Sequence, residues 1–505
     1  VAQVDPPRPS IGTVSVVVLV GYLLALVAMG FYFSRRERTT DDFFLGGRRV
    51  PWWAAGLSIF GTQLSAITFL AIPAKTYATD WLYFIQNLGI VAVAPLVVWI
   101  CLPFYRRLDV TSVYEYLEHR FHVAHRLFGA ASFVLFQLAR MGIVLYLPAL
   151  ALAAVTGLDI VWCIVAMGVL CTLYTVLGGI EAVIWTDVLQ VGVLLGGAAT
   201  ALVVVLTGVD GGFETVRETA AAHEKFRWVD ARWDWTGPAI GVILLGAVFN
   251  NLVPYAGDQA VVQRYLTTAD EKQAARAVWT GALMAIPASL LFFFVGTALF
   301  VFYSVHPERL NPVGANDQIF AWFIARELPV GVAGLVIAGV FAAAMSSLDS
   351  SMNSIAAVLT SDVYRRFGAP RSDAHYLRFA RGITLILGAV GTLTALWLAG
   401  ADVKSLWDVF LGAIGLLGGT MSGLLILGMI STRANSPGAA IGAFASLAAL
   451  VAAKWVTELS GLLYAAIGMV TCIVVGYLAS LLVPGRVREL TGLTLFTRST
   501  VATDR

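Results

Sequence analysis

The stretch SIFGTQLSAITFLAIPAK, residues 58–75, decides how this chain folds. It is apolar enough to lie in a bilayer, yet glycine, threonine, glutamine and serine interrupt it between residues 61 and 68, and Pro73 follows. A spanning helix satisfies its own backbone hydrogen bonds, and glycine and proline break that ladder. We therefore expect a helix that is broken near mid-membrane, where free carbonyl oxygens and amide groups can bind an ion or a solute.

A second interruption occurs in VFNNLVPYAGDQ, residues 248–259, five apolar segments later. Here Asn250, Asn251, Pro254 and Gly257 interrupt an otherwise apolar helix. Two interrupted helices at matching places in successive five-helix units are typical of inverted repeats with a substrate site at the membrane midplane. Two unrelated kinks are the alternative interpretation.

The composition indicates an integral membrane protein. The 505 residues are 59% hydrophobic and 13% charged, with a mean hydropathy of +0.81, whereas a soluble domain has about 25% charged residues. The net charge is +2 and the basic residues are dispersed, which excludes a nucleic-acid groove. No feature indicates an obligate protein partner. The four cysteines lie in apolar segments at no metal-ligand spacing, so we expect buried thiols rather than disulfides or zinc: Cys101, Cys163, Cys171 and Cys472.

Apolar runs of about 20 residues are long enough to span a bilayer as helices. We count thirteen and predict an all-α protein with one transmembrane domain. The first run is expected to be a retained helix, because the polar start VAQVDPPRPS is not followed by a cleavable signal pattern. The predicted spans lie near residues 11–34, 51–78, 81–105, 125–155, 159–177, 181–208, 237–258, 275–303, 330–361, 378–400, 405–430, 436–456 and 460–484.

The basic residues predict the orientation. One set of alternating loops holds 22 of the 33 Lys and Arg residues and the other set holds ten, which leaves Arg140 inside a span. Because cytoplasmic loops carry the excess of basic residues, the N-terminus is expected outside and the tail, residues 486–505, in the cytoplasm.

The segment FAAAMSSLDSSMNS, residues 341–354, carries a ribbon of polar groups. Ser346, Asp349, Ser350 and Asn353 recur at helical spacing and share one face. Hydroxyl and carboxylate oxygens suit a hard cation such as Na⁺. Close packing of two helices through small serines is the alternative.

Two further charged residues lie inside predicted spans, where a charge costs about 2.5–3.5 kcal/mol. Arg140 has a guanidinium that matches a carboxylate in two parallel bonds, which indicates an anionic substrate. Asp187 is a candidate second cation ligand. The alternative is an internal ion pair of Arg140 with Asp187 or Asp349. All histidines fall in loops or at helix ends, so no imidazole relay or membrane enzyme is indicated.

The chain resembles the sodium:solute symporter family over about residues 12–485. The resemblance is carried by the interrupted span, by the serine-rich segment and by VLGGIEAVIWTDVLQ, residues 176–190. Within the family it is most similar to bacterial sodium/sialic acid symporters, through DDFFLGGRRVPWWAAGLSIF and TSVYEYLEHRF. LYLPALALAAVTGLDI also resembles the iodide and vitamin branches.

The resemblance implies a LeuT-like transporter in a bacterial inner (plasma) membrane. It would import a small carboxylate-bearing solute, sialic acid (N-acetylneuraminate), with one or two Na⁺ ions by alternating access. A neutral sugar, another monocarboxylate or a vitamin is the alternative substrate, and a sodium-independent channel is the alternative class. The implied domain, residues 1–485, comprises an extra helix at 11–34, inverted repeats at 51–208 and 237–430, and two C-terminal helices at 436–484.

The resemblance also implies site residues, position by position. Sodium would bind backbone oxygens and two serine hydroxyls: Gly61, Leu64, Ala343, Ser346 and Ser347. A second cation site would use Asp187, Asp349 and Ser350; the sialic acid branch has a hydroxyl residue at position 349, so this carboxyl would bind Na⁺ more tightly or take up a proton. The substrate positions would be Gln63, Ser65, Thr68, Tyr83, Asn87, Arg140 and Phe249. Arg140 matches the arginine that holds the sialate carboxylate, whereas Gln63 and Asn87 depart from that branch and leave the ligand's identity open.

Overall fold

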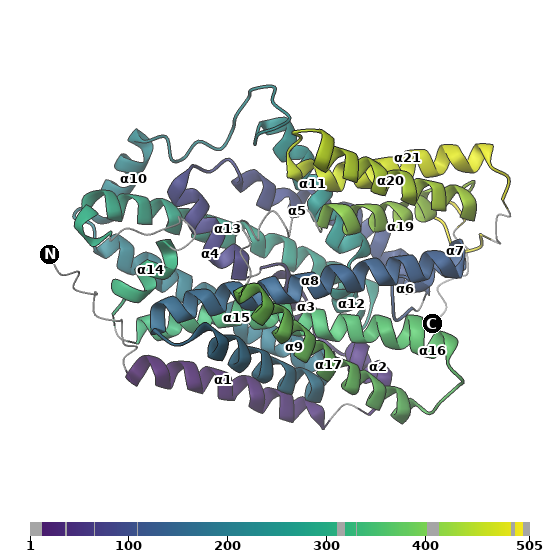
Figure 1. Ribbon diagram of the computed structural model, residues 1–505, viewed down its shortest axis with the longest axis horizontal. Helices are drawn as coiled ribbons and strands as arrows, with labels where there is room; N and C mark the ends of the chain where they lie inside the picture. The colour runs from purple at the N-terminus through teal and green to yellow at the C-terminus, as the bar shows by residue number, and fades with distance from the viewer. Residues whose placement is uncertain are drawn as a thin grey trace.

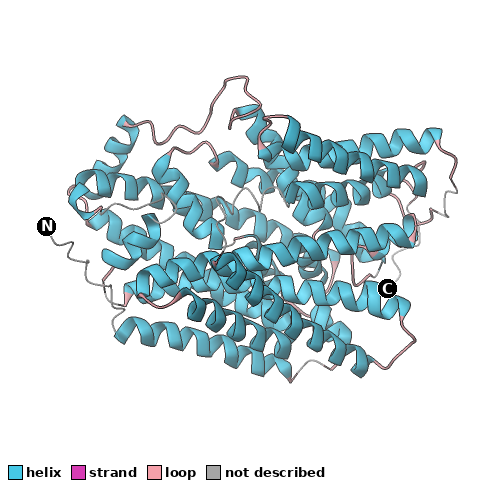
Figure 2. Cartoon of the chain, viewed as in Figure 1, coloured by secondary structure: helices cyan, strands magenta, loops and turns pink. Residues whose placement is uncertain are grey.

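The computed structural model describes residues 13–35, 38–64, 66–108, 110–310, 319–329, 331–400, 414–485 and 490–497. Within these ranges the chain forms helices and their connections, and no strand occurs (Figure 2). The long helices run roughly along the longest axis of the molecule (Figure 1). An all-α membrane protein is therefore confirmed.

The helices differ widely in length. The long ones are α1 (Thr13–Ser34), α8 (Val123–Thr156), α9 (Ile160–Thr207), α11 (Ile240–Gly257), α13 (Glu271–Val305), α15 (Val332–Val358), α17 (Asp373–Ala399), α20 (Ser436–Val456) and α21 (Tyr464–Leu482). Helix α5 (Phe84–Leu96) continues through residues 97–101 into α6 (Leu102–Leu108), and together they form one span of 25 residues. The shorter ones are α2 (Thr40–Leu45), α3 (Trp52–Gln63), α4 (Ala66–Ala78), α6 (Leu102–Leu108), α7 (Glu115–Arg120), α10 (Gly212–Ala222), α12 (Gln259–Leu266), α14 (Ile319–Arg326), α16 (Arg365–Phe367) and α19 (Thr420–Ile430).

The predicted count of thirteen spans is not confirmed. Among the described residues, ten helices are long and apolar enough to cross a membrane, or eleven if the bent pair α3 and α4 forms one span. The difference arises partly in α9, whose 48 residues contain two predicted spans that meet at Gly179 (φ 52, ψ −153). A straight helix of that length would measure about 72 Å, more than twice the hydrocarbon thickness of about 30 Å. The predicted span 405–430 lies partly outside the described residues.

The predicted break in the second span is present. Helix α3 ends at Gln63, the next residue, Leu64, has a non-helical backbone (φ −83, ψ 89), and α3 and α4 are bent by 55°. The second interruption lies later than expected, because α11 continues through both asparagines. Asn250 and Asn251 donate to the helix's own carbonyls of Gly246 (2.9 Å) and Ala247 (2.7 Å), which keeps the helix intact. The chain breaks only at Asp258, which caps α12.

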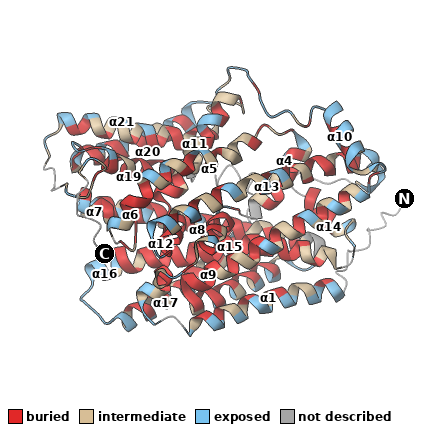
Figure 3. Ribbon diagram, turned by 180° about the vertical axis from the view of Figure 1, so that it is seen from behind, coloured by how far each residue is buried: buried red, intermediate tan, exposed pale blue. Residues whose placement is uncertain are grey.

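The core lies around α15. Figure 3 shows buried residues concentrated where α8, α9, α12 and α15 meet. In the most apolar 18-residue stretch of the span that begins with α15, 83% of the residues are buried. In the corresponding stretch of α1, 22% are buried. A helix that is enclosed on all sides can carry polar groups only if other helices supply their partners. Helix α15 therefore holds its serines and aspartate inside the protein.

The short helices mark the two ends of the bundle. Helices α2, α7 and α16, next to loops predicted to be rich in arginine, lie at one end, and α10 and α14 lie at the other (Figure 1). The loops are thus grouped in space as the charge pattern predicts. The end that faces the cytoplasm stays a prediction.

Candidate functional site

The broken end of α3 meets α15 through oxygen atoms. The last carbonyls of a helix have no helical partner, and here the Gly61 carbonyl receives an outside donor. The Ser346 hydroxyl lies 3.3 Å from this carbonyl oxygen and 3.4 Å from that of Ala343. Three of the predicted sodium ligands therefore contact one another across two helices. Leu64 is buried at the break, where its backbone leaves the helix (φ −83, ψ 89).

Arg140 of α8 lies beside these oxygens. Its Nη2 donates to the carbonyl of Thr62 at 2.6 Å and lies 3.5 Å from the hydroxyl of Ser347. Its Nε has no partner in the part of the chain that the structure describes. Arg140 forms no ion pair with Asp187 or Asp349 within the described ranges. Its guanidinium contacts the Thr62 carbonyl and the hydroxyl of Ser347, a predicted sodium ligand.

Arg264 of α12 occupies the centre of the predicted second cation site. Its Nη2 donates to Asp187 Oδ2 (3.1 Å) and to the Ser350 hydroxyl (2.5 Å), and its Nε donates to the Ser58 hydroxyl (2.7 Å). The side chains of Arg264 and Asp187 are both 0% exposed. Asp187 Oδ1 has no partner among the described residues. The structure thus pairs the candidate cation ligand with a fixed positive charge.

Asp349 faces the first half of α9. Its Oδ2 accepts a hydrogen bond from the Tyr174 hydroxyl at 2.6 Å, and its Oδ1 lies 3.2 Å from the Ser350 hydroxyl. Ser350 also donates to the Ser346 carbonyl. No basic side chain forms an ion pair with Asp349 within the described ranges. Ser350 contacts Asp349, and Arg264 donates to both Ser350 and Asp187. The three predicted residues of this site, Asp187, Asp349 and Ser350, therefore belong to one hydrogen-bonded group.

Arg264 was not predicted as a site residue, because the polar segment after Gly257 was expected to be a loop. Every residue of α12 is buried, so Arg264 does not belong to an exposed loop. The set of loops that was expected to hold 22 basic residues therefore holds one fewer. One signal could have found Arg264: a carboxyl inside a span usually pairs with a cation, and the predicted spans supply one basic residue, Arg140, for two such carboxyls.

A cavity of about 190 Å³, lined by both apolar and polar side chains, lies beside the break of α3. Of the predicted substrate residues, Gln63, Thr68 and Asn87 line it. The prediction missed other polar residues that line it: Gln86, Asn250, Asn251 and Ser289.

The remaining predicted substrate residues lie elsewhere. Phe249 packs against the apolar cluster that α11 forms with α21, and Tyr83 lies beneath the Lys75 ammonium, 5.3 Å from its ring centre. Arg140 does not line the cavity either, and Ser65 lies outside the described residues.

The donor set suits an alkali cation. Carbonyl and hydroxyl oxygens are hard ligands. Among the described residues, no group of three or more His, Cys, Asp or Glu side chains could hold a transition metal. Together with the broken helix and the cavity beside it, these oxygens define an ion-coupled transporter of the helical membrane class.

Comparison with known proteins identifies the family. The sodium:solute symporter family profile matches residues 43–446, and the chain belongs to this family. It is 42% identical to the sodium/sialic acid symporter SiaT of Proteus mirabilis (strain HI4320) over 471 residues, which are 92% of this chain and 94% of that protein. It is also 42% identical to the sodium/sialic acid symporter NanT of Aliivibrio fischeri (strain ATCC 700601 / ES114) over 473 residues, 93% of this chain and 94% of that protein.

Solved structures agree with this assignment. A substrate-bound, outward-open Na⁺-coupled sialic acid symporter matches with a TM-score of 0.89 and 40% identity, covering 94% of this chain and 99% of that one. The nucleobase-cation symporter Mhp1 in a closed conformation matches with a TM-score of 0.61 and 17% identity, covering 86% of this chain and 93% of that one, and shows the shared fold alone. The chain is therefore a multi-pass membrane transporter that couples to Na⁺, not an enzyme.

Proposed function

We propose that this chain imports sialic acid, a sugar that bears a carboxylate, together with Na⁺. One observation carries the proposal: the Ser346 hydroxyl lies within 3.4 Å of two carbonyl oxygens from separate helices, with the Arg140 guanidinium against the adjoining turn. This arrangement supplies hard oxygen ligands for a cation next to a fork-shaped donor for a carboxylate. The 42% identity to sodium/sialic acid symporters over nearly the whole chain supports the choice of substrate.

Sodium entry supplies the driving force. One Na⁺ that moves down about 100 mV releases roughly 2.3 kcal/mol, and a tenfold concentration gradient adds about 1.4 kcal/mol. Two ions together release roughly 7 kcal/mol, enough for about a 10⁵-fold accumulation of a neutral solute. An anion accumulates less, because it moves against the membrane potential.

Arg140 is the proposed link between ion and substrate. Its guanidinium lies 3.5 Å from the hydroxyl of Ser347, a proposed sodium ligand, and a positive charge at that distance opposes a cation. A substrate carboxylate that draws the guanidinium toward the cavity would relieve this repulsion. Sodium and carboxylate would then strengthen each other's binding by the same factor, since coupling between two sites is reciprocal.

We propose that one Na⁺ binds at the site of Gly61, Leu64, Ala343, Ser346 and Ser347. The second cation site, at Asp187, Asp349 and Ser350, holds an ion only when Arg264 leaves it, because the guanidinium already neutralises the Asp187 carboxylate at 3.1 Å. This proposal predicts that removal of Arg264 creates or strengthens a second sodium site.

The larger arrangement follows the same proposal. The segments 51–208 and 237–430 are the inverted repeats, 11–34 and 436–484 are accessory helices, and the arginine-rich end faces the cytoplasm. A green fluorescent protein fused to the C-terminus should then fluoresce in a bacterial host, and an alkaline phosphatase fused there should be inactive. The reverse pattern contradicts the orientation.

A neutral sugar is the second candidate substrate, because the described lining of the cavity carries amides and hydroxyls but no charged side chain. Amide side chains donate and accept hydrogen bonds with sugar hydroxyls as readily as with a carboxylate. For this alternative, Arg140 would serve only to hold α3 against α8.

The test is uptake of labelled sialic acid by proteoliposomes under an inward Na⁺ gradient, with a K⁺ gradient of equal strength as the control. We expect uptake only with Na⁺, and a loss of more than about tenfold in both Arg140→Ala and Arg140→Lys, since a lysine keeps the charge without the fork. Arg433→Gln, which removes an exposed arginine remote from the cavity, is the matched control. Uptake that is equal in Na⁺ and K⁺ contradicts sodium coupling. Unchanged uptake in both Arg140 variants returns this residue to a structural role.

A further inference from the structure

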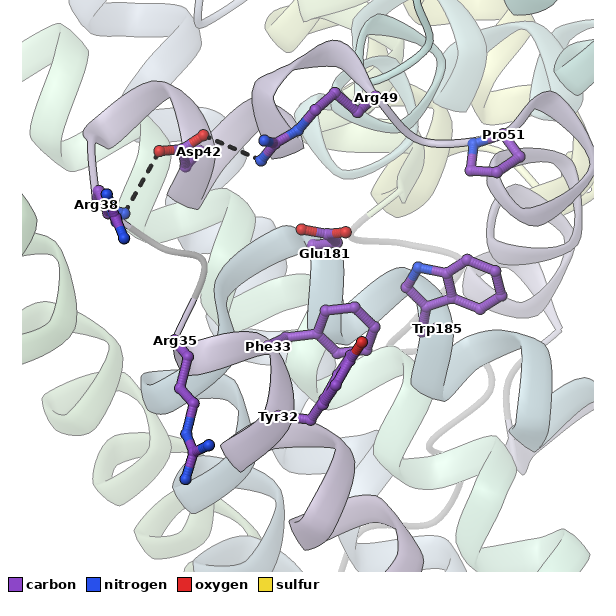
Figure 4. Close-up of a pocket in the computed structure, with 9 residues that line it drawn as sticks. All are labelled: Tyr32, Phe33, Arg35, Arg38, Asp42, Arg49, Pro51, Glu181 and Trp185. Atoms are coloured by element: carbon purple, nitrogen blue, oxygen red, sulfur yellow. Dashed lines mark hydrogen bonds and ion pairs between the residues drawn. The ribbon is translucent and has the colours of Figure 1, made fainter.

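A second pocket, separate from the transport cavity, lies between the end of α1, α2 and the second half of α9 (Figure 4). Its volume is about 820 Å³. Three of the residues that line it are arginines: Arg35, Arg38 and Arg49. The proposed transport mechanism uses none of them.

The arginines outnumber the acidic side chains that line the pocket. Asp42 and Glu181 are its two carboxylates. Asp42 is already engaged, because Arg49 Nη2 lies 3.2 Å from its Oδ1 and its Oδ2 caps the start of α2 by accepting from Thr39. Figure 4 shows Asp42 between Arg38 and Arg49. The side chain of Arg35 forms no ion pair within the described ranges, so the pocket has guanidinium groups available for an anion.

Aromatic side chains form the other wall. Phe33 and Trp185 stack with ring centres 6.4 Å apart, and Tyr32 meets Phe33 edge to face at 5.0 Å. Trp53 meets Trp185 edge to face, with ring centres 5.4 Å apart. Trp and Tyr gather where a membrane protein crosses the lipid headgroups, because their rings are apolar and their N–H or O–H groups are polar. These rings place the pocket at the headgroup level.

The pocket lies at the end of a helix, α1, whose side is exposed and apolar. Helix α1 ends directly before Arg35, and its apolar side chains Val17, Leu24 and Phe31 are exposed. In a bilayer, such a face contacts acyl chains. A ligand with a phosphate group and acyl chains could therefore bind the arginines with its headgroup and lie along α1 with its chains, whereas a free phosphate would use only the first of these surfaces.

We propose that this pocket binds the phosphate of an anionic phospholipid. Arginine forks match phosphate oxygens in paired bonds, and basic pockets at the cytoplasmic ends of membrane helices bind anionic headgroups. Arg35 and Arg38 hold the phosphate, Tyr32 and Trp185 border the glycerol region, and α1 supports the acyl chains. The site is independent of the transported solute, so the proposed function can fail while this inference stands.

The test is native mass spectrometry of the full chain in detergent, titrated with phosphatidylglycerol or with phosphatidylcholine of the same acyl chains. Each arginine near an anionic headgroup strengthens binding about fivefold, so Arg35→Gln/Arg38→Gln should bind phosphatidylglycerol about 25-fold more weakly. Arg371→Gln/Arg433→Gln is the matched control, because it removes two exposed arginines from the same set of loops and should leave the affinity unchanged.

A second measurement separates lipid from free phosphate. In nanodiscs, replacing phosphatidylcholine by phosphatidylglycerol should raise the melting temperature of the wild type and the control more than that of Arg35→Gln/Arg38→Gln. Inorganic phosphate added to phosphatidylcholine nanodiscs should not reproduce the rise. Equal phosphatidylglycerol affinity in the two double variants, or an equal rise with inorganic phosphate, overturns the proposal.

Discussion

Replacement of Arg264 by methionine should destabilise the protein far more than its hydrogen bonds alone would suggest. The guanidinium is 0% exposed and donates to Asp187, Ser58, Ser350 and the carbonyl of Ala260. Methionine fills much of the same volume but leaves the Asp187 carboxylate buried without a cation. Removal of one partner of a buried ion pair costs about 3–5 kcal/mol.

The comparison that isolates this cost is a double-mutant cycle. Asp187→Asn keeps an oxygen that accepts from Ser58 and removes the negative charge. Arg264→Met/Asp187→Asn should therefore recover most of the unfolding free energy lost in either single variant, measured by denaturant unfolding in mixed micelles. Arg120→Met is the matched control, because Arg120 is also buried and donates to the backbone carbonyls of Gly428 and Ser431, but it forms no ion pair within the described part of the chain. Its cost, about 1–3 kcal/mol, should not be relieved by Asp187→Asn.

Sodium should distinguish the Arg264 variant further. A carboxylate that has lost its arginine can bind Na⁺ with Ser350, so NaCl should stabilise Arg264→Met more than the wild type, by about 2.7 kcal/mol at a hundred times the dissociation constant. Choline chloride at the same ionic strength is the control. If Arg264→Met costs under about 1 kcal/mol, or if the double variant loses the sum of the single losses, the reasoning from charge burial is refuted.

Three shorter predictions concern packing, the unpaired carboxyl and acid stability. Gly296→Ala should cost about 1–3 kcal/mol or more, because its Cβ would lie 2.3 Å from a carbonyl oxygen of α4, whereas Gly192→Ala, with nothing within 4 Å, should be neutral; thermal unfolding of the pair measures the difference. Asp349→Asn should cost no more than about 1 kcal/mol and keep Na⁺-driven uptake, since this carboxyl contacts only hydroxyls among the described residues; a higher Na⁺ requirement would instead make it an ion ligand. The Arg366 guanidinium lowers the pKa of Glu118 to about 2, so about 1–3 kcal/mol of stability is present above pH 5 and is lost as the pH falls toward 2. Glu118→Gln should then lose less stability than the wild type between pH 5 and pH 3, and equal losses contradict this.

Sequence periodicity and composition predicted the broken helix and its oxygen atoms. A glycine followed by polar residues inside an apolar span leaves carbonyls without helical partners, and this rule needs no tertiary information. The pairing of Ser346 with Gly61 came from the resemblance to the family, because neither pattern by itself says which two helices meet. Helical spacing within 341–354 likewise placed Asp349 and Ser350 on one face, and both lie near Tyr174 or Arg264.

The rotation of apolar helices could not be predicted in the same way. Phe249 was assigned to the cavity, yet it packs toward α21, while its neighbours Asn250 and Asn251 line the cavity. One residue along a helix turns the side chain by about 100°, and a helix that is apolar on all sides carries no mark of its inner face. Arg264 was missed for the converse reason: the segment after Gly257 is polar enough to predict a loop, and only its neighbours bury it.

The ion pair of Arg264 and Asp187 also limits how the protein can move. It joins α12 to α9, and these helices belong to different proposed repeats. If the repeats separate along that contact in each transport cycle, the opening penalty of about 3–5 kcal/mol slows the step by roughly 10²- to 10⁴-fold. Fast turnover therefore requires that these helices travel as one rigid block, with the sliding surface elsewhere in the bundle.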